Sequence, residues 1–592
     1  MNKFLPESIN KAACRYSALA ILNCYVREIA IPHHLLEFVQ NGKDFVFIKF
    51  PMCNKNVSVS VANRSAIGNL IYTSALMVVD LNADSTAEHF PWENLPLLVV
   101  EELCLRFKND SVKQELLAQI ENSAALIEQT VEHGLRMGGS SYKDYIESEA
   151  ALIYGHFFHP APKCRQGFSE SEALIYGPEF GRSFQLHYFA LAPETQWIVT
   201  AGEFAVQSLI QDMAQIRTQD LPKGWSLLPC HPWQAKYLLQ QPVVNEAIAE
   251  ESLKYLGASG VYFRPTASVR TLYSPDFPYF LKCSLSMRIT NSVRKNAYYE
   301  LEGAVSLTRI LSPFISILSQ RFPCFEFVLE PFALSANLPQ ADHKTQKDLR
   351  SHCGVIFRDA IPFRASPSIQ HWLAATLLAD DHCGESWLEK CFLAQGIAKH
   401  TPLSKNFAHE WFASYLEHLV LPLLSAYFEQ GIACEPHLQN VVVKLNQGWP
   451  CGVILRDLEG TKLVEGIWNA AMVEDLSGQA LTSVLHDEHK TWRRLSYCLF
   501  VNHIGQAIYQ LCNFGIDENQ LWQQVREVLK SYLKSNSSAL VERRIGGLLG
   551  GDALISKANL ITRFFQQADS DASYVLLPNP MNISVPEVME HA

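Results

Sequence analysis

The sequence predicts an α+β protein of several subdomains, with a central, mainly antiparallel sheet region and a helical C-terminal half. Residues 258–333 carry alternating polar and apolar positions and proline-containing turns, which are typical of strands. Beyond Pro362, apolar residues at helical spacing predict helices at 368–396, 405–430, 490–513 and 518–535, interrupted by a strand pair at 440–457. Strands gathered in one part of the chain and helices in another are the α+β pattern.

The other segments suggest how the chain divides. Its 592 residues allow about four structural units or fewer, at roughly 150 residues each. Residues 97–133 read as helical, and the stretch from Gly138 to Gly181 is rich in Gly, Pro, Ser and His, as functional loops often are. A polar stretch at 336–350 marks an insertion or a boundary. We expect three subdomains, at 1–140, 141–360 and 361–592.

Composition excludes several classes of protein. A formal net charge of −11 argues against a nucleic-acid partner, since phosphate backbones demand a basic face. Apolar runs such as 419–428 are interrupted by Pro422 and Ser425, so we expect no membrane span. Residues 17–26 resemble a signal-peptide core, but flanking charges and the lack of a cleavage motif favour an amphipathic helix. We therefore expect a cytoplasmic protein.

The cysteines point the same way. The chain has 15 of them, scattered and without any C-x-x-C motif. Zinc and iron–sulfur sites need several thiolates at short spacings. Reduced, mostly buried thiols are the prediction.

Two predicted strands carry a polar face with several cations. On 279–290 the polar side chains are Lys282, Ser284, Ser286, Arg288 and Thr290, and upstream Arg264, Thr266, Ser268 and Arg270 alternate in the same way. If the runs pair about the turn at 274–278, Ser268 faces Ser284 and Arg270 faces Lys282. Arg294 follows four residues after Thr290.

A solvated sheet face is the alternative interpretation, but such faces normally mix charge signs. Between Val261 and Gln320 the only acidic residues are Asp276, Glu300 and Glu302, and Asp276 lies in the turn. An unbalanced positive face in a net-acidic protein indicates an anionic ligand, because Arg and Lys grip phosphates and carboxylates.

A second group of polar residues lies at the base of a predicted hairpin. Strands at 441–445 and 451–455 flank a turn at 446–448, and this pairing brings His437, Gln439 and Asp457 together. An aspartate directly after an apolar strand is a familiar magnesium ligand, alongside substrate phosphates. His437 is suited to orienting a phosphate or to acid–base chemistry, although a lone histidine is more often structural.

Six segments in order resemble the NRPS-independent siderophore synthetases of the aerobactin-synthetase type, from about residue 150 to the C-terminus. The segments are GHFFHPAPKCRQG at 155–167, LPCHPWQ at 228–234, PTASVRTL at 265–272, KCSLSMRITNSVR at 282–294, EPHLQN at 435–440 and RDLEG at 456–460. Phe157 stands where the family usually has proline. This departure leaves the shape of that loop and the acid substrate open.

The resemblance implies a fold like a cupped hand, with thumb, fingers and palm at 1–140, 141–360 and 361–592, and a homodimer. It implies that ATP and Mg²⁺ are the cofactors, that Lys282, Arg294 and His437 are catalytic, and that Asp457 and Glu435 hold the metal. The implied ATP-binding residues are Ser268, Arg270, Thr271, Lys282, Thr290, His437, Gln439 and Asp457. The implied acid-binding residues are His159, Lys163, Ser268, Arg270 and Arg294.

The family chemistry suits both groups of residues. A carboxylate attacks the α-phosphate of ATP, pyrophosphate leaves, and an amine or hydroxylamine then displaces AMP. Preorganised Arg, Lys and Mg²⁺ stabilise the charge that develops on the phosphate oxygens. We favour citrate as the acid because Arg270, Lys282, Arg294 and His159 offer several cationic contacts. A citrate monoamide, 2-oxoglutarate and a succinyl derivative stay open, as does the amine.

Two other functions are alternatives to a synthetase. A kinase-like phosphotransferase is suggested by Asp457 at a strand end, but the chain has no G-x-x-x-x-G-K-[ST] loop, and the glycine-rich run at 546–551 lacks the lysine. A non-catalytic siderophore-binding or ferric-reductase-related protein would share the C-terminal resemblance. Such a reductase needs clustered C-terminal cysteines, whereas Cys512 stands alone.

Overall fold

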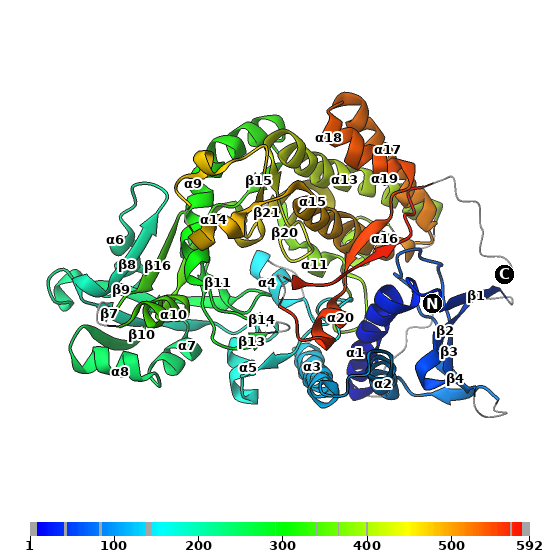
Figure 1. The fold of residues 1–592 in the computed structure, drawn as a ribbon, viewed down its shortest axis with the longest axis horizontal. Helices are drawn as coiled ribbons and strands as arrows, with labels where there is room; N and C mark the ends of the chain where they lie inside the picture. The colour runs from blue at the N-terminus through cyan, green and yellow to red at the C-terminus, as the bar shows by residue number, and fades with distance from the viewer. Residues whose placement is uncertain are drawn as a thin grey trace.

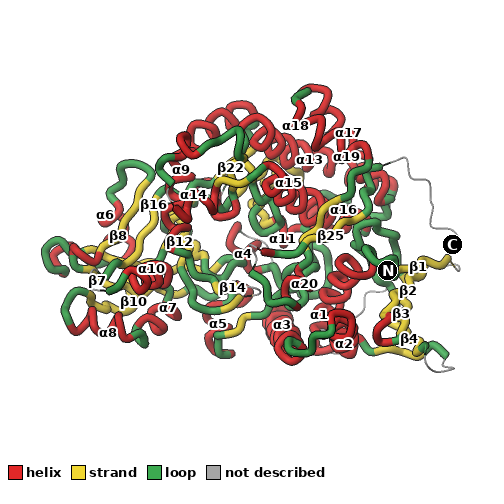
Figure 2. The backbone as a smooth tube through the Cα atoms, in the orientation of Figure 1, coloured by secondary structure: helices red, strands yellow, loops and turns green. Residues whose placement is uncertain are grey.

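A computed structural model describes residues 9–40, 44–81, 86–137, 144–289, 292–338, 341–364, 366, 368–397, 401–476, 478–568 and 571–582. Figure 1 shows the N-terminal strands and the sheet around β7 and β10 at opposite ends of the long axis. The C-terminal helices cover the top of the view and join these two ends. Figure 2 shows helices in this upper part and further helices along the lower edge of the molecule. The expected α+β class with a helical C-terminal half is confirmed.

The N-terminal region pairs a small sheet with three helices. Buried Val46, Ile48 and Phe50 alternate with half-buried residues along one strand, as expected for a sheet packed on one face. The predicted helical stretch 97–133 is two helices, because Lys108 adopts a left-handed φ of 52° that ends the first. The elements are α1 (Ile9–Tyr25), a π-helical turn (Val26–Ala30), the antiparallel meander β1 (Leu36–Gln40), β2 (Asp44–Phe50), β3 (Lys55–Ser60), β4 (Leu76–Asp80) and β5 (Glu88–Phe90), then α2 (Leu95–Phe107) and α3 (Lys113–Arg136).

An eight-stranded sheet forms the middle region, and every neighbouring pair in it is antiparallel. Its order is β8 (Gln196–Thr200), β16 (Phe332–Ala336), β17 (Val355–Asp359), β12 (Tyr279–Cys283), β11 (Thr271–Tyr273), β10 (Leu253–Pro265), β7 (Phe184–Leu191) and β9 (Ser226–Cys230). The strand prediction is wrong for 298–321, which form the helix α9 (Tyr298–Arg321). The Glu300 carboxylate accepts the Ala297 N–H at 2.8 Å and caps it, while Leu301, Val305 and Leu311 are buried.

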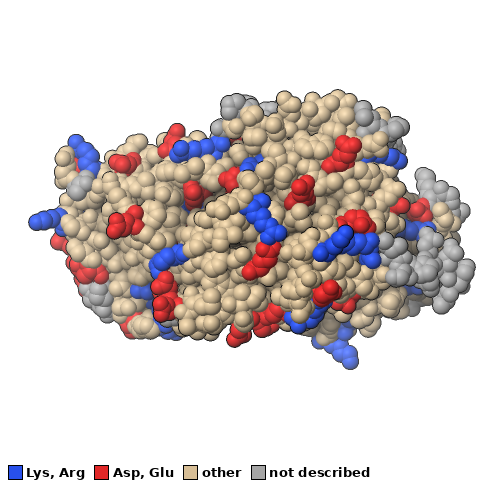
Figure 3. Space-filling view, turned by 90° about the horizontal axis from the view of Figure 1, so that it is seen from above, with Lys and Arg blue, Asp and Glu red and all other residues tan. Residues whose placement is uncertain are grey.

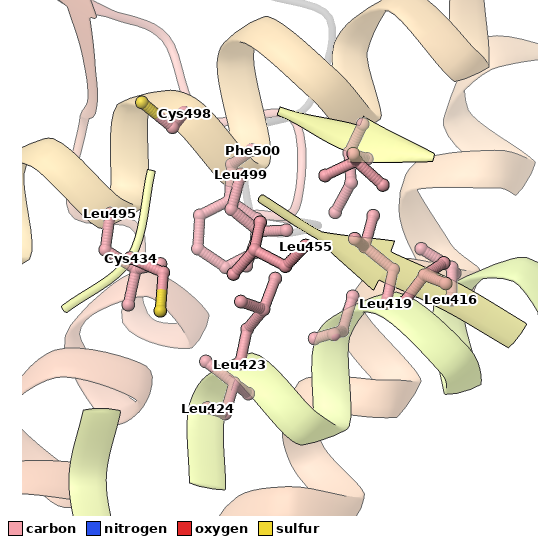
Figure 4. Close-up of a cluster of buried hydrophobic side chains, with 14 of the residues drawn as sticks. Leu416, Leu419, Leu423, Leu424, Cys434, Leu455, Leu495, Cys498, Leu499 and Phe500 are labelled. Carbon is pink, nitrogen blue, oxygen red and sulfur yellow. The ribbon is translucent and has the colours of Figure 1, made fainter. Parts of the chain in front are cut away.

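The C-terminal half is built on α13 (Pro402–Gln430), α15 (Glu488–Ser496), a π-helical stretch (Tyr497–Ile504), α16 (Gly505–Cys512) and α17 (Glu518–Ser535). The hairpin β20 (Val441–Asn446) and β21 (Trp449–Leu455) lies against α13. Figure 4 shows Leu419 and Leu423 of α13 meeting Leu455 of β21 and Leu499 and Phe500 of the π-helical stretch. The predicted helix 368–396 is wrong, because 369–373 are β18 (Ile369–Leu373), an edge strand paired with β20, and only 374–377 and 387–393 of the rest are helical.

Shorter elements complete the fold. They are α4 (Tyr145–Ala150), β6 (Arg165–Gln166), α5 (Glu170–Tyr176), α6 (Val206–Ala214), α7 (Pro232–Leu238), α8 (Pro242–Ala249), β13 (Arg288–Ile289), β14 (Ser292–Val293), β15 (Phe325–Phe327), α10 (His343–Cys353), α11 (Ala374–Leu377), α12 (Trp387–Leu393), β19 (Ile432–Ala433), β22 (Lys462–Val464), α14 (Gly478–Val484), β23 (Leu485–His486), α18 (Ala539–Val541), α19 (Gly547–Gly550), β24 (Leu554–Lys557), α20 (Asn559–Phe564) and β25 (Tyr574–Leu577). The polar stretch at 336–350 is therefore largely α10.

Among the described residues, α9 alone is long and apolar enough to cross a membrane, by length and composition, and half of its most apolar window is buried. The core helix of a soluble protein passes the same test. Figure 3 shows Lys and Arg interspersed with Asp and Glu over one face of the molecule, without a large patch of a single sign.

Candidate active site

The turn between β10 and β11 sets the first part of the site. The predicted hairpin of 264–270 with 279–290 is wrong, because β10 ends at Pro265 and the chain bends at 266–270. Val269 adopts a φ of 69°, and the Thr266 N–H donates to the Thr271 carbonyl at 2.8 Å. β11 then pairs with β12 so that Thr271, and not Arg270, lies opposite Lys282. The expected register is off by one residue.

Lys282 is buried at the centre of the site, with 1% of its side chain exposed. Its Nζ lies 2.7 Å from Asp457 Oδ1 and 2.7 Å from Glu459 Oε2. Burial alone would lower the pKa of the Lys282 ammonium, but the two carboxylates outweigh burial and raise that pKa above its ordinary value. Lys282 is therefore held as a fixed positive charge.

Arg270 lies beside it and is also buried. Its guanidinium donates to Asn296 Oδ1 at 2.6 Å and to Glu459 Oε2 at 3.0 Å. The Asn296 side chain in turn donates to the Lys282 carbonyl at 2.8 Å, which fixes both cations to one framework. The expectation that these cations lack acidic partners is wrong. The partners come from residues 457–459, far away in the sequence.

Asp457 joins the two halves of the site. It follows β21 with φ 81° and ψ 91°, a strained conformation that non-glycine residues rarely adopt. Besides Lys282, its Oδ1 lies 3.2 Å from the buried guanidinium of Arg358, which also pairs with buried Glu330 at 2.7 Å. Burial would raise the pKa of Asp457, but Lys282 and Arg358 hold it well below its ordinary value. Sequence reasoning missed Arg358, which lies on a strand outside the quoted motifs.

Glu459 forms the exposed edge of this network. Its side chain is 36% exposed, and Lys282 and Arg270 overcome the effect of burial and lower its pKa to about 2. Burial and the Glu459 charge together raise the pKa of Glu300, at the start of α9, to about 7. Two neighbouring carboxyl groups are thus driven apart in acidity, a pattern that suits acid–base roles. Neither had been assigned a role from the sequence.

The base of the hairpin brings His437 and Gln439 to the same place. Gln447 and Gly448 turn the chain with φ of 49° and 75°, as the sequence predicts. The Arg456 N–H donates to the Asn440 carbonyl at 3.0 Å, and the Arg456 guanidinium donates to the Gln439 carbonyl at 2.8 Å. His437 is half-buried. Burial lowers its pKa, and the nearby charges of Glu435 and Asp457 oppose this, so the imidazole is neutral at pH 7.

Glu435 faces a further set of cations. Its Oε1 lies 3.0 Å from Arg494, and a side chain at Gly460 would place a Cβ 2.4 Å from Glu435 Oε2. Glycine at 460 therefore lets Glu435 approach the 457–459 turn. Lys462 donates to the Glu459 carbonyl at 2.6 Å, and burial, with Arg494 nearby, lowers its pKa to about 8. Lys462 and Arg494 are cations that the motifs did not reveal.

The glycine- and histidine-rich loop at 155–167 carries a further group of polar residues. Burial, together with the charges of His159, His437, Arg27 and Lys557, lowers the pKa of His156 to about 3. His159 is buried, and its Nδ1 accepts the Ala161 N–H at 3.1 Å.

Lys163 lies at the end of the same loop in a buried ion-pair group. It pairs with Glu179, which also binds Arg165 at 2.5 Å, and it donates to the Leu152 carbonyl at 2.6 Å. Burial lowers the pKa of Lys163 to about 8. Its ammonium is engaged within the protein, so its role in substrate binding stays a prediction.

The other predicted residues are placed as follows. Ser268 accepts the Thr271 N–H at 3.2 Å and lies beside Thr266 in the bend. Half-buried Arg294 is fixed by its main chain, which bonds Met287 and Leu285 at 3.0 and 2.8 Å. Thr290 lies outside the described residues, and for Arg288 only the backbone is described.

Comparison with known proteins matches the two halves of the chain to two different families. The profile of the IucA / IucC family matches residues 144–379, and that of the ferric iron reductase FhuF-like transporters matches 409–572. A spermidine-citrate ligase of Bacillus anthracis is 28% identical over 95% of this chain and 96% of its own. An L-2,3-diaminopropanoate–citrate ligase of Staphylococcus aureus is 28% identical over 87% of this chain and 88% of its own.

A solved structure agrees over nearly the whole length. ATP-bound aerobactin synthetase IucA from a hypervirulent pathotype of Klebsiella pneumoniae superimposes with a TM-score of 0.83, at 24% identity, over 96% of this chain and 99% of that one. This likeness shows that the α+β multi-subdomain fold is shared. The family match and the full-length relatives extend the likeness beyond the fold. Residues 144–379 form an IucA / IucC family domain, and the chain as a whole is similar to the NRPS-independent siderophore synthetases of the aerobactin-synthetase type.

Proposed function

We propose that this protein is an ATP-dependent siderophore synthetase that joins citrate to an amine through a citryl-adenylate. A citrate carboxylate oxygen attacks the α-phosphorus of ATP and pyrophosphate leaves. The amine then attacks the acyl carbon, loses a proton, and expels AMP, so that an amide forms. The names of relatives from three genera support citrate as the acid, since each is called a citrate ligase or a citryl synthase.

The observation that carries the proposal is the buried charge network of Lys282, Arg270, Asp457 and Glu459. Two cations are held rigidly by carboxylates and by Asn296, so they need no reorganisation when charge develops on phosphate oxygens. The Ser268 hydroxyl lies in the bend just before β11, near the same cations. We assign Ser268, Arg270, Thr271, Lys282 and Gln439 to ATP, together with Thr290 from the family resemblance.

The acid is proposed to bind between this network and the histidine-rich loop. His159, Arg294 and Lys557 supply the contacts for its other carboxylates, and Lys163 supports the loop through Glu179. His437 is neutral and stands next to Asp457, so it is suited to accept the proton that the amine loses. Proximity of the bound reactants supplies the rest of the acceleration.

Mg²⁺ fits the carboxylates of this site. It prefers hard oxygen ligands, usually one or two carboxylates together with substrate phosphates. Gly460 allows Glu435 close to the 457–459 turn, and the charges of Glu435 and Asp457 both act on His437. We propose that these two carboxylates hold the ion, which would neutralise phosphate charge. Arg494, Lys282 and Arg358 already lie beside these carboxylates, so the anionic substrates would meet these cations and the ion together.

The wider setting is also proposed. We infer a cytoplasmic homodimer with small-molecule substrates, without nucleic-acid or membrane partners, and with thumb, fingers and palm at 1–140, 141–360 and 361–592. The mixed charge on the face shown in Figure 3 supports the absence of a nucleic-acid partner, which would need a basic surface.

The FhuF-like match makes a ferric-reductase-related function the second candidate. An iron–sulfur centre of that kind requires four thiolates. Within the matched span, Cys434 and Cys498 belong to the buried core, and Figure 4 shows their sulfur atoms apart from each other. Among the described residues, the one group of His, Cys, Asp and Glu with converging ligand atoms is 381–383, outside that span. The synthetase is therefore favoured.

The deciding experiment incubates the purified protein with ATP, Mg²⁺, a panel of acids and a panel of amines. Pyrophosphate and product mass are measured together. Citrate is expected to release pyrophosphate and AMP and to give an amide with at least one amine. Release of ADP would favour a kinase-like phosphotransferase, and no nucleotide turnover with any acid would refute the proposal.

A further inference from the structure

Two adjacent charged residues of the N-terminal helix, Arg27 and Glu28, lie buried where three distant segments meet. Each is only 2% exposed. They lie in the π-helical turn that follows α1, in a region that carries none of the six family segments. Burying ionisable groups costs free energy that apolar residues of similar size avoid, and burial raises the pKa of the Glu28 carboxyl to about 8.

Arg27 contacts the loop that carries the histidines. Its guanidinium carbon lies 3.1 Å from the centre of the Phe158 ring, directly before His159. Its Nε donates to the Ile67 carbonyl at 2.9 Å, and a second nitrogen donates to Asn69. Only a planar guanidinium offers this combination of stacking and directed hydrogen bonds. Arg27 therefore fixes the ring beside His159.

Glu28 contacts the other acid-side segment. Its two oxygens accept the N–H groups of Leu560 and Ile561 at 3.0 and 2.9 Å, at the start of α20. This helix begins two residues after Lys557. The ring of contacts is closed by Asn559, whose side chain donates to the Phe158 carbonyl at 2.8 Å.

We propose that Arg27 and Glu28 are positioning residues that hold His159 and Lys557 together on the acid-binding side of the site. The inference rests on the proposed function for the identity of that side. Among the described residues, neither Arg27 nor Glu28 forms a hydrogen bond or ion pair with β11 or β12 on the ATP side, so the effect should be selective for the acid. Neither residue touches the reacting atoms.

The test uses the full-length protein and measures dissociation constants for citrate and for ATP by calorimetry. Arg27→Lys keeps the charge but loses the stacking and the fork of hydrogen bonds. We expect its citrate constant to rise by about tenfold, since small displacements of binding groups carry such costs, while the ATP constant changes by less than about twofold. Asn559→Ala should show the same selectivity. Glu28→Gln, which keeps an acceptor oxygen, should bind citrate several times more tightly than Glu28→Ala.

Arg563→Lys is the matched control. Arg563 is also buried, lies on α20, and donates to Gln119 and Glu115 of α3. It should lose thermal stability without selective loss of citrate binding. The inference is overturned if Arg27→Lys leaves the citrate constant unchanged, or if citrate and ATP weaken together as one. Wild-type protein that binds citrate and ATP without releasing pyrophosphate would refute the proposed function. The selective loss of citrate binding in Arg27→Lys would still test whether Arg27 positions the acid-binding side.

Discussion

The Lys282 ammonium lies 2.7 Å from the Asp457 carboxylate, although 174 residues separate them in the chain. Lys282 belongs to the eight-stranded sheet and Asp457 to the end of the C-terminal hairpin. Their contact therefore joins the two halves that the two family profiles match separately. Both charges are fixed by this contact, which is the preorganisation that the proposed stabilisation of phosphate charge requires.

Replacing Lys282 should abolish most of the turnover. Lys282→Met removes the central cation and leaves Asp457 and Glu459 without it, so we expect pyrophosphate release to fall by roughly a hundredfold or more. Lys282→Arg should retain part of the activity. Lys444→Met is the control, because Lys444 on β20 forms a similar ion pair with Glu326 of β15, away from the site. Equal rates in Lys282→Met and Lys444→Met would contradict the assignment.

Arg294 and His437 should both be needed for turnover and not for folding. Each is half-buried and lies on an irregular segment rather than in a core. Arg294→Ala and His437→Ala are expected to lower the rate of amide formation by about tenfold to a hundredfold. Circular dichroism melts should stay close to those of the wild type. Near-normal rates in both variants would show that the acid and base lie elsewhere.

Asp457 separates backbone strain from charge. Asparagine tolerates positive φ, so Asp457→Asn should fold, whereas Asp457→Val adds strain at φ 81°. We expect Asp457→Asn to lose about 2 kcal/mol of unfolding free energy, since Lys282 and Arg358 lose a charged partner. It should also lose nearly all activity. Urea unfolding measures the stability of Asp457→Asn, and a pyrophosphate assay measures its activity. Simple misfolding would lower stability and activity in proportion, whereas loss of the charge should remove nearly all activity from a protein that still folds.

Glu179 should make stability depend on pH. Although burial would raise the pKa of Glu179, Arg165 and Lys163 lower it to about 2 from an ordinary 4.5. The stabilisation from this carboxylate is complete above about pH 4.5 and is lost as the pH falls toward 2. Glu179→Gln should therefore be less stable than the wild type at pH 6, and the gap should narrow by pH 3. A constant gap over this range would show that the ion pairs do not supply the stabilisation.

The sequence predicts a contact in this site only where the residues that form it lie close together in the chain. The hairpin with Gln447 and Gly448 was predictable, because turn residues and alternating apolar strands specify the pairing within twenty residues. The bend at Val269 was not, because a valine with positive φ carries no local signal. Because the sequence does not show this bend, the predicted pairing is displaced by one residue, and Thr271 rather than Arg270 lies opposite Lys282.

Helix and strand were confused where a pattern was ambiguous. The run at 298–321 contains alternating residues as well as helical spacing, and only the Glu300 cap at its start marks the helix. Residues 369–373 read as part of a helix, because the strand β20 that pairs with them is seventy residues away.

The charge network was half visible in the sequence. Lys282, Arg270 and Asp457 were found from alternation and from a strand end. Their partners Glu459 and Arg358 were missed, since nothing local shows which carboxylate a distant cation meets. The buried pair at Arg27 and Glu28 was likewise invisible, because it is defined only by contacts with residues far along the chain.

Oxygen transfer tests the central claim most directly. The protein is incubated with ATP, Mg²⁺, a productive amine and citrate labelled with ¹⁸O in its carboxylates, and the nucleotide product is examined by mass spectrometry. If a citryl-adenylate forms, one labelled oxygen appears in AMP, because the carboxylate oxygen that attacked the α-phosphorus leaves with it. Label in inorganic phosphate with ADP as product, or amide formation with unlabelled AMP, would contradict the account.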